Sequence, residues 1–457
     1  MADRLNDLRA ALRRSRVASA SQLRAGLRVS QPTLSRLLSQ LGGDVVRLGR
    51  GPRTRYAIAR SVRGFPSTIP LFRIRENGVG EQAGVVRPLD PEGFALLNPP
   101  DGFWPRPGDM ADGYFEGLPY FLFDIRPQGF IGRALAKRRA AELNVSSDPT
   151  NWGDDDVLVV LLLAGEDLPG DLVLGEAAYE RLATRMLRQK PAFSDAELKD
   201  AYPRLAEDAL ADDVPGSSAG GEFPKFTASR TTSDGHREVI VKFSGADDTP
   251  AVRRWSDLLV AESVAAANTS GNLGDAAPCR ILQFGGRTFL EIDRFDRVGP
   301  WGRKPVSTLS SIEAALLGRG DARWDRAASS LAEHGLVDTA ARDQIITRWC
   351  FGNLIANGDM HAGNLAFYPA ARALELTPSY DMLPMQYAPA RGGEVPAPAF
   401  NPPLPLPGLE GEWLTAASAA VRFWEDCAGN ELISTGFRDI CRRNAEGVAV
   451  LRARIGG

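Results

Sequence analysis

Three polar residues in the C-terminal half of the chain have the types and spacing that phosphoryl transfer requires. Asp359 is followed five residues later by Asn364, and Asp381 comes 17 residues after that asparagine. One carboxylate can orient or deprotonate an attacking hydroxyl group, while an amide oxygen and a second carboxylate hold Mg²⁺ on nucleotide phosphates. The set therefore predicts kinase chemistry, although the usual kinase sequence motifs are absent.

Each of these residues also has a plain structural explanation, because Asp and Asn commonly stabilise turns and cap the segments that follow. Only their joint order, together with a lysine and a glycine-rich segment upstream, favours catalysis. His361 lies between Asp359 and Asn364 and is one of three histidines. It can contact a phosphate or shape the loop, and nothing by itself makes it a metal ligand.

The upstream lysine is Lys242, in a strand predicted over 238–243. The alternating pattern places two valines on one face of this strand and Lys242 on the other. A lysine inside an apolar strand is costly unless a negative group pairs with it. In kinases the partners are nucleotide phosphates and a helix glutamate, and Glu262, in the helix predicted over 252–267, is the candidate. The alternative is an exposed lysine on an edge strand.

A glycine- and serine-rich segment at 216–225 precedes that strand. Small residues leave backbone N–H groups unobstructed, which suits the binding of phosphates. Most segments of this composition are only loops, so the interpretation depends on Lys242 nearby. Residues 287–297 are predicted as a strand that runs into a linker, which is where a kinase hinge would receive the adenine on its backbone.

Apolar spacing predicts the elements that position these residues. A helix at 339–353 leads directly into the Asp359 motif, and a hairpin of strands at 365–368 and 374–377 delivers Asp381. The proline-rich stretch 389–408 is interpreted as a surface loop. Further helices are expected at 129–143, 174–190, 311–317, 324–334, 414–427 and 433–454, and buried strands at 119–124 and 157–164.

The first 63 residues differ sharply in charge from the rest, because they contain 14 arginines and only three acidic residues. Three short helices and a strand–turn–strand with an arginine-rich tip are predicted there, which resembles a winged helix-turn-helix. Such a basic head favours nucleic acid as its partner. The alternative is a small protein-docking module. The predicted DNA contacts are Thr33, Arg36 and Gln40 on the third helix and Arg50 and Arg53 at the tip.

Composition sets outer bounds on the function. The 457 residues are enough for two to four domains, and 44% hydrophobic with 24% charged residues is ordinary for a globular protein. The longest apolar run is too short to span a bilayer. The four cysteines have no paired spacing, so we expect a reduced cytoplasmic protein without a membrane partner.

Taken together, the segment from Ser217 to Lys225, Lys242, the run 294–297, the run from Asn357 to Asn364 and the run from Pro378 to Asp381 resemble the HipA-like serine/threonine kinases of toxin–antitoxin systems. The resemblance covers about 67–455. The fused basic head resembles the YjjJ-like branch of that family. The family has an α+β, two-lobed protein-kinase-like fold, here preceded by the winged helix-turn-helix.

The resemblance implies roles for individual residues. Asp359 would be the catalytic base, Asn364 and Asp381 the Mg²⁺ ligands, and Ser217 or Ser218 a site of autophosphorylation that silences the kinase. The loop has one residue more than the family pattern, and Asp293 stands where Glu is expected. Implied ATP contacts are Ala219, Gly220, Gly221, Lys225, Lys242, Asp293, Phe295, His361, Asn364, Tyr380 and Asp381.

We therefore expect three domains: a DNA-binding head at 1–63, an N-terminal subdomain with the kinase N-lobe at 64–290, and a helical C-lobe at 291–457. The expected function is an ATP- and Mg²⁺-dependent protein kinase that arrests growth. Expected partners are DNA, through 1–63, and an unidentified protein substrate, and a homodimer is compatible with the sequence. Two alternatives stay open: a transcription regulator whose kinase-like domain only senses nucleotide, and a small-molecule phosphotransferase.

Overall fold

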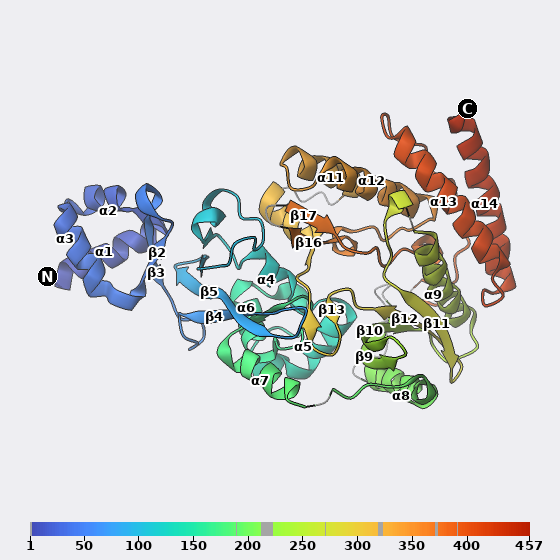
Figure 1. Ribbon diagram of the computed structural model, residues 1–457, viewed down its shortest axis with the longest axis horizontal. Helices are drawn as coiled ribbons and strands as arrows, with labels where there is room; N and C mark the ends of the chain where they lie inside the picture. Colours follow the sequence, from blue (N-terminus) through green and yellow to red (C-terminus); the bar gives the residue numbers. More distant parts are fainter. Residues whose placement is uncertain are drawn as a thin grey trace.

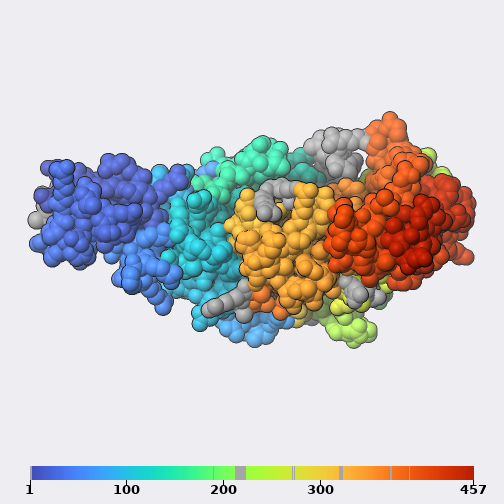
Figure 2. All heavy atoms as spheres, turned by 90° about the horizontal axis from the view of Figure 1, so that it is seen from above, coloured from blue at the N-terminus to red at the C-terminus, as the bar shows by residue number. Residues whose placement is uncertain are grey.

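The computed structural model describes residues 2–188, 190–211, 223–269, 271–318, 323–370, 373–390 and 392–457. The chain forms an elongated molecule in which the N-terminal head stands at one end and the C-terminal helices at the other (Figure 1). From above, the head is a distinct knob beside the larger body (Figure 2). No helix among the described residues is both long and apolar enough to cross a membrane.

The head folds as its sequence predicts at the level of helices and strands. Leucines spaced at three and four residues bury one stripe of each helix, and these stripes meet in a common core. Ser19 and Ser30 cap the second and third helices, and Pro32 lies in the first turn of the third. The elements are α1 Ala2–Ser15, β1 Ala18–Ser19, α2 Ala20–Leu27, α3 Gln31–Leu41, β2 Val45–Leu48 and β3 Arg55–Ala59.

The sheet of the head continues into the next part of the chain. Strand β3 pairs with β2 on one side and, through Ile58 and Ala59, with β5 on the other. The strand order is β1-β3-β5-β4-β8, with β6 paired to β5 and β7 paired to β6. The elements of this middle part are β4 Ile69–Ile74, β5 Gly80–Asp90, β6 Phe94–Leu97, β7 Tyr114–Phe115, α4 Tyr120–Asp124, α5 Gly129–Leu143, α6 Asp154–Ala164, β8 Leu172–Leu174 and α7 Glu176–Met186.

Two strands expected in this middle part are helices instead. Residues 119–124 and the apolar run 157–164 lie in α4 and α6. Nearly every residue of that run is buried, so α6 has no polar face that would reveal a helical period. Three aspartates in the first turn of α6 favour a helix start, because they complement the positive end of the helix dipole.

An antiparallel sheet of four strands, in the order β11-β12-β10-β9, forms the N-lobe. Val239 and Val241 of β10 pack with Tyr202 of α8 in one core cluster, whereas Lys242 faces α9 on the other side. The alternation read from the sequence is therefore confirmed. The elements are α8 Leu198–Ala211, β9 Lys225–Thr232, β10 Gly235–Phe243, α9 Pro250–Asn268, β11 Cys279–Phe284 and β12 Arg287–Asp293.

The C-lobe is mostly helical and follows a linker that contains two short strands. Its three-stranded sheet has the order β15-β16-β17. The proline-rich stretch packs on the last helices, since Trp413 Nε1 donates to the Pro403 carbonyl at 2.9 Å. The elements are β13 Arg297–Val298, β14 Gly302–Arg303, β15 Ser307–Thr308, α10 Leu309–Ile312, a π-helix Glu313–Leu317, α11 Trp324–Glu333, α12 Thr339–Leu354, β16 Ala366–Ala370, β17 Ala373–Leu376, α13 Glu410–Gly429 and α14 Thr435–Gly456.

Candidate active site

Lys242 and Glu262 form a buried ion pair between β10 and α9. The Lys242 Nζ atom lies 2.6 and 2.7 Å from the two carboxylate oxygens of Glu262. Their side chains are only 5% and 6% exposed. The helix partner expected for the strand lysine is thus in place, and the pairing explains how an apolar strand tolerates a charge.

Asp381 brings the C-lobe to the same lysine. Its Oδ1 atom lies 2.5 Å from Lys242 Nζ, although the two residues are 139 apart in sequence. The Asp381 backbone has a φ of +55°, which is uncommon outside glycine. Asn357 holds this conformation by donating from Nδ2 to the Asp381 carbonyl at 3.2 Å.

The charges in this cluster shift one another's pKa values. Burial acts to lower the pKa of Lys242, but Asp381 and Glu262 outweigh it and raise that pKa. Burial acts to raise the pKa of Asp381, but Lys242 and Lys225 hold it below its usual value. For Glu262, burial wins over Lys242 and the pKa is raised. An ionised Asp381 beside a protonated lysine follows from these directions.

The loop with Asp359 begins where α12 ends. Asn357 accepts the Asp359 N–H on its Oδ1 at 3.0 Å, and Asn364 Nδ2 donates to the Asp359 carbonyl at 2.9 Å. Buried Trp324 fixes the middle of the loop through a bond from Nε1 to the His361 carbonyl. The Asp359 side chain is 53% exposed. The loop thus has a fixed backbone and a carboxylate that solvent or a substrate can reach.

Tyr380 and Phe295 connect this loop to the linker after β12. The Tyr380 hydroxyl donates to the Gly363 carbonyl at 2.8 Å, and its ring lies 5.5 Å from that of Phe295, centroid to centroid. Tyr368 donates to the Phe295 carbonyl at 3.1 Å. A cavity of about 20 Å³, lined by Glu262, Cys279, Tyr380 and Asp381 among others, lies beside them. It has room for about one water molecule.

The oxygen donors present suit a Mg²⁺ ion. Asn364 uses its amide nitrogen for the Asp359 carbonyl, which leaves the Oδ1 atom without a hydrogen bond among the described residues. Asp381 uses only Oδ1 for Lys242, and its side chain is 30% exposed. One amide and one carboxylate oxygen are hard ligands of the kind Mg²⁺ takes when phosphates supply the others.

The remaining predicted ATP contacts have different surroundings. Lys225 begins β9 and pairs in register with Lys242. Asp293 ends β12, where its carboxylate accepts from Arg237 at 2.7 Å; burial raises its pKa and Arg237 opposes the rise. His361 Nε2 lies 3.9 Å from Asp359. The loop residues Ser217, Ser218, Ala219, Gly220 and Gly221 lie outside the described residues.

Sequence reasoning assigned no role to Asn357 or Trp324, which shape the loop. For Asn357 a signal existed, since an Asn side chain often bonds the backbone two residues on, as it does to Asp359 here. For Trp324 none existed, because its partner His361 is remote in sequence. Such contacts depend on how α11 packs beside the loop.

The predicted DNA contacts lie on the outer side of the head. Arg36, Gln40 and Arg50 are exposed, and Thr33 is half-buried beside the Ser30 cap. Arg53 is also exposed, but its Nε atom lies 3.6 Å from Asp112 of the middle part.

Comparisons with known proteins show which family the chain resembles. The family model described as "YjjJ-like toxin, middle domain" matches residues 65–183, and "HipA-like C-terminal domain" matches residues 217–425. Toxin YjjJ of Escherichia coli (strain K12) is 38% identical over 444 residues, which cover 96% of this chain and 97% of that protein. The chain belongs to the YjjJ-like toxin family.

Among solved structures, a chain from the Shewanella oneidensis MR-1 complex of HipA, HipB and operator DNA matches 84% of this chain and 97% of its own length. Its TM-score is 0.52 at 16% sequence identity, so this likeness concerns the fold. A Helicobacter pylori proinflammatory kinase, CtkA, has a TM-score of 0.36, too low to support an argument. The expected HipA-like, kinase-like fold is confirmed, and the chain is a kinase-like member of a toxin family.

Proposed function

We propose that this chain is an ATP- and Mg²⁺-dependent serine/threonine protein kinase whose activity arrests growth. The observation that carries the proposal is the meeting of Lys242, Glu262 and Asp381 from three distant segments in one buried cluster. A structural ion pair would not need the third member, whose backbone has a positive φ. Family membership with a toxin supports the same conclusion.

The hydrogen bonds of Lys242 imply that this lysine must exchange a carboxylate partner for phosphate when a nucleotide binds. An ammonium group has three protons, and Glu262 and Asp381 use all of them. Lys242 can therefore reach the α/β-phosphates only by giving up one of these bonds, and we expect it to release Asp381, whose side chain is more exposed than that of Glu262. The released carboxylate and the Asn364 amide oxygen would then hold Mg²⁺, which neutralises charge on the phosphates.

We assign the role of catalytic base to Asp359. Its carboxylate is exposed, whereas its backbone is fixed at both ends by Asn357 and Asn364. It would accept the hydrogen bond of a substrate hydroxyl and take its proton as the new phosphate ester forms.

The test is transfer of label from γ-labelled ATP to the chain itself and to lysate proteins. We expect transfer by the wild type, loss with Asp359→Ala, and retention with Asp439→Ala. Asp439 is a matched control because it is a half-exposed carboxylate whose one ion-pair partner among the described residues is Arg442. Absence of transfer by the wild type, or equal transfer by both variants, would contradict the proposal. Expression of wild type and Asp359→Ala in growing cells tests the toxic role.

Autophosphorylation of the glycine-rich segment follows from the family resemblance. We expect phosphoserine at Ser217 or Ser218 after incubation with ATP, and none in Asp359→Ala. Mass spectrometry of the variants Ser217→Ala and Ser218→Ala, made separately, identifies which serine is modified. Modification of neither would leave the kinase proposal intact and remove self-silencing at this loop.

A second function, DNA binding by the head, is favoured by how its arginines are paired. Of its 14 arginines, seven have carboxylate partners, and six of these partners belong to the middle part. Those pairs dock the head on the body. Within the described residues no carboxylate partner is found for Arg4, Arg14, Arg24, Arg28, Arg36, Arg47 and Arg50.

Unpaired, exposed arginines are what a phosphate backbone requires. We expect Arg36→Ala and Arg50→Ala to weaken DNA binding several-fold in fluorescence anisotropy, with a steep dependence on salt. Arg53→Ala should have a smaller effect, since Asp112 competes for it. Arg13→Ala is the control, because Arg13 is bound to Asp90 at 2.6 Å. Binding that does not depend on salt, or that Arg13→Ala weakens as much, would contradict this function.

A further inference from the structure

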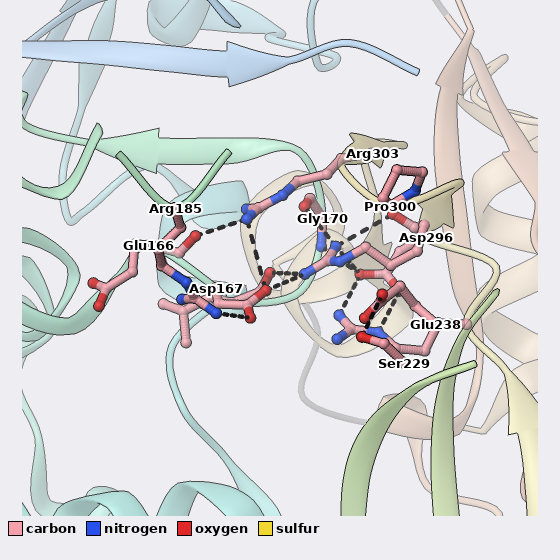
Figure 3. Close-up of polar contacts among 12 residues, drawn as sticks. Glu166, Asp167, Gly170, Arg185, Ser229, Glu238, Asp296, Pro300 and Arg303 are labelled. Atoms are coloured by element: carbon pink, nitrogen blue, oxygen red, sulfur yellow. Dashed lines mark hydrogen bonds and ion pairs between the residues drawn. The ribbon is translucent and has the colours of Figure 1, made fainter. Parts of the chain in front are cut away.

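The linker between the two lobes, residues 296–308, lies against the middle part along its whole length. At its start Asp296 is buried and accepts the Gly170 N–H at 3.0 Å, together with bonds from Arg294 and Arg297 (Figure 3). Arg297 also donates to the Leu168 carbonyl at 2.6 Å. These contacts begin one residue after Phe295, the predicted adenine contact.

The middle of the linker is held by packing. Trp301 packs against a small core of the middle part that contains Ile74 and Leu182. Gly302 passes so close to the Glu76 carbonyl that no side chain would fit there. Arg303 donates to the Glu166 carbonyl at 2.7 Å. Burial lowers the pKa of Arg303 to about 9, a sign of how completely this stretch is enclosed.

The end of the linker is fixed by one carboxylate of the middle part. Asp124, at the end of α4, accepts four hydrogen bonds, from Ser307 Oγ, Thr308 N, Thr308 Oγ1 and Ser311 Oγ, at 2.6 to 3.0 Å. Thr308 is the residue before α10. Leu309 N then donates to the Leu365 carbonyl at 2.7 Å, one residue after Asn364. Asp124 is thus two contacts away from the predicted metal ligand.

We propose that the middle part braces the interlobe linker at both ends and so sets the geometry of the two halves of the ATP site. In this arrangement the Asp296–Arg297 contacts position the hinge, and Asp124 positions the loop that carries Asp359. Both are positioning residues, since neither touches the reacting atoms. This proposal rests on the proposed kinase function for its kinetic consequence, although not for its structural one.

Because different residues hold the two ends of the linker, single substitutions can loosen each end separately. Arg297→Lys keeps the positive charge but cannot span Asp296 and the Leu168 carbonyl, so it loosens the hinge end. Asp124→Asn replaces a carboxylate that accepts four bonds with an amide that accepts fewer, so it loosens the loop end. Asp148→Asn is the control: Asp148 is an exposed carboxylate of the middle part that accepts hydrogen bonds from Thr150, and no hydrogen bond joins it to the linker among the described residues.

The kinetic test is steady-state phosphorylation by the full chain. We expect Arg297→Lys to raise the KM for ATP at least threefold with kcat within twofold. Asp124→Asn should lower kcat at least tenfold with the KM for ATP within twofold, and Asp148→Asn should change neither. If both linker variants change the same parameter alike, or Asp148→Asn changes kcat as Asp124→Asn does, the brace is refuted.

The structural test needs no activity, and so separates this proposal from the kinase function. Hydrogen exchange of the full chain is compared in residues 357–366. We expect exchange there to be at least tenfold faster in Asp124→Asn, and still faster than wild type in the gentler Thr308→Val, with no change in Asp148→Asn. Exchange altered only around 120–124 and 307–311 would overturn the proposal even for an active kinase. Faster exchange in an inactive protein would support it.

Discussion

Two buried clusters of charged side chains flank the hinge, and they differ in how completely they are closed. In the cluster around Asp296, the arginine groups bind Asp296 and also backbone carbonyls of the middle part. In the cluster around Lys242, one oxygen of Asp381 has no hydrogen bond among the described residues, and that side chain is 30% exposed. Both carboxylate oxygens of Asp296 are thus bonded, and we call its surroundings the closed cluster, whereas the surroundings of Lys242 form the open cluster.

Shifted pKa values alone do not identify a functional cluster. The pKa of Asp296 is held far below its usual value: burial opposes the shift, but Arg294 and Arg297 outweigh it. The pKa of Asp381 is lowered for a similar reason. What distinguishes Asp381 is its open oxygen, its positive φ and its place on the C-lobe while its partners lie on the N-lobe. Structural ion networks perturb pKa values as strongly as sites do.

We expect the largest effect on activity from a substitution in the open cluster. Asp381→Asn removes the charge that would hold the cation, so phosphoryl transfer should fall on the order of 10²- to 10³-fold. The free energy of unfolding should hardly change, because Lys242 keeps Glu262. Labelled-ATP assays and urea unfolding of the same preparation measure both quantities. A large loss of stability would make this cluster structural, like its neighbour.

The closed cluster should respond in the opposite way. Asp296→Ala leaves Arg294 and Arg297 buried without their carboxylate, which should cost about 3–5 kcal/mol of unfolding free energy. Urea unfolding measures this loss. A variant with wild-type stability but no activity would show that the closed cluster takes part in chemistry. The distinction between a structural and a functional cluster would then be wrong.

A third buried carboxylate, Asp171, should make the stability of the protein depend on pH. Burial raises the pKa of Asp171 to about 6, although Arg73, a backbone hydrogen bond and Arg303 oppose the rise. Because the folded pKa is above the unfolded one, Asp171 favours folding at low pH, and this contribution is lost as pH rises from about 4 to 6, by roughly 2–3 kcal/mol. Asp171→Asn should flatten the stability curve in that window. Thermal melts between pH 4 and 7 test this, with an unchanged curve contradicting it.

The smallest effect concerns Arg303, at the edge of the closed cluster. Its Nη1 atom is buried and has no hydrogen-bond partner in the described part of the chain, while Nη2 donates to the Glu166 carbonyl. Arg303→Lys keeps the charge and loses that one bond, so we expect a loss of about 1 kcal/mol in urea unfolding. A loss as large as that of Asp296→Ala would mean that the cluster depends on every arginine equally.

Much of the fold could be predicted from the sequence because its signals are local. Ser19, Ser30 and the leucine stripes of the head, the alternation around Lys242, and the helix before Asp359 all have a clear period or cap. The errors fell on α4 and α6, where burial on all sides removes the period. The continuation of the head sheet into β5 could not be foreseen, because two residue pairs of β3 and β5 carry it.

The site was predictable in its chemistry but not in its supports. Lys242 and Glu262 could be connected because a lysine in an apolar strand demands a partner, and the structure pairs them. The contact of Lys242 with Asp381, which was predicted only as a Mg²⁺ ligand, was not foreseen. The roles assigned to Asp359, Asn364, His361 and the loop serines stay predictions. Asp124 carried no signal, since it is an ordinary aspartate whose partners lie in another segment. Asp296 stood in the run 294–297 that carries the family resemblance, but no pattern there indicated its bond to Gly170.

The pairing of β3 with β5 bears on how this protein can be divided. A cut after residue 63 would strip Ile58 and Ala59 from β5, remove the Arg60 N–H bond to the Pro88 carbonyl, and leave Asp155 and Asp156 without their arginines. The shortened chain would present a bare strand edge, and such edges recruit other strands and promote aggregation. The head is therefore poorly suited to removal as a module, and a truncated protein that precipitates would say little about toxicity.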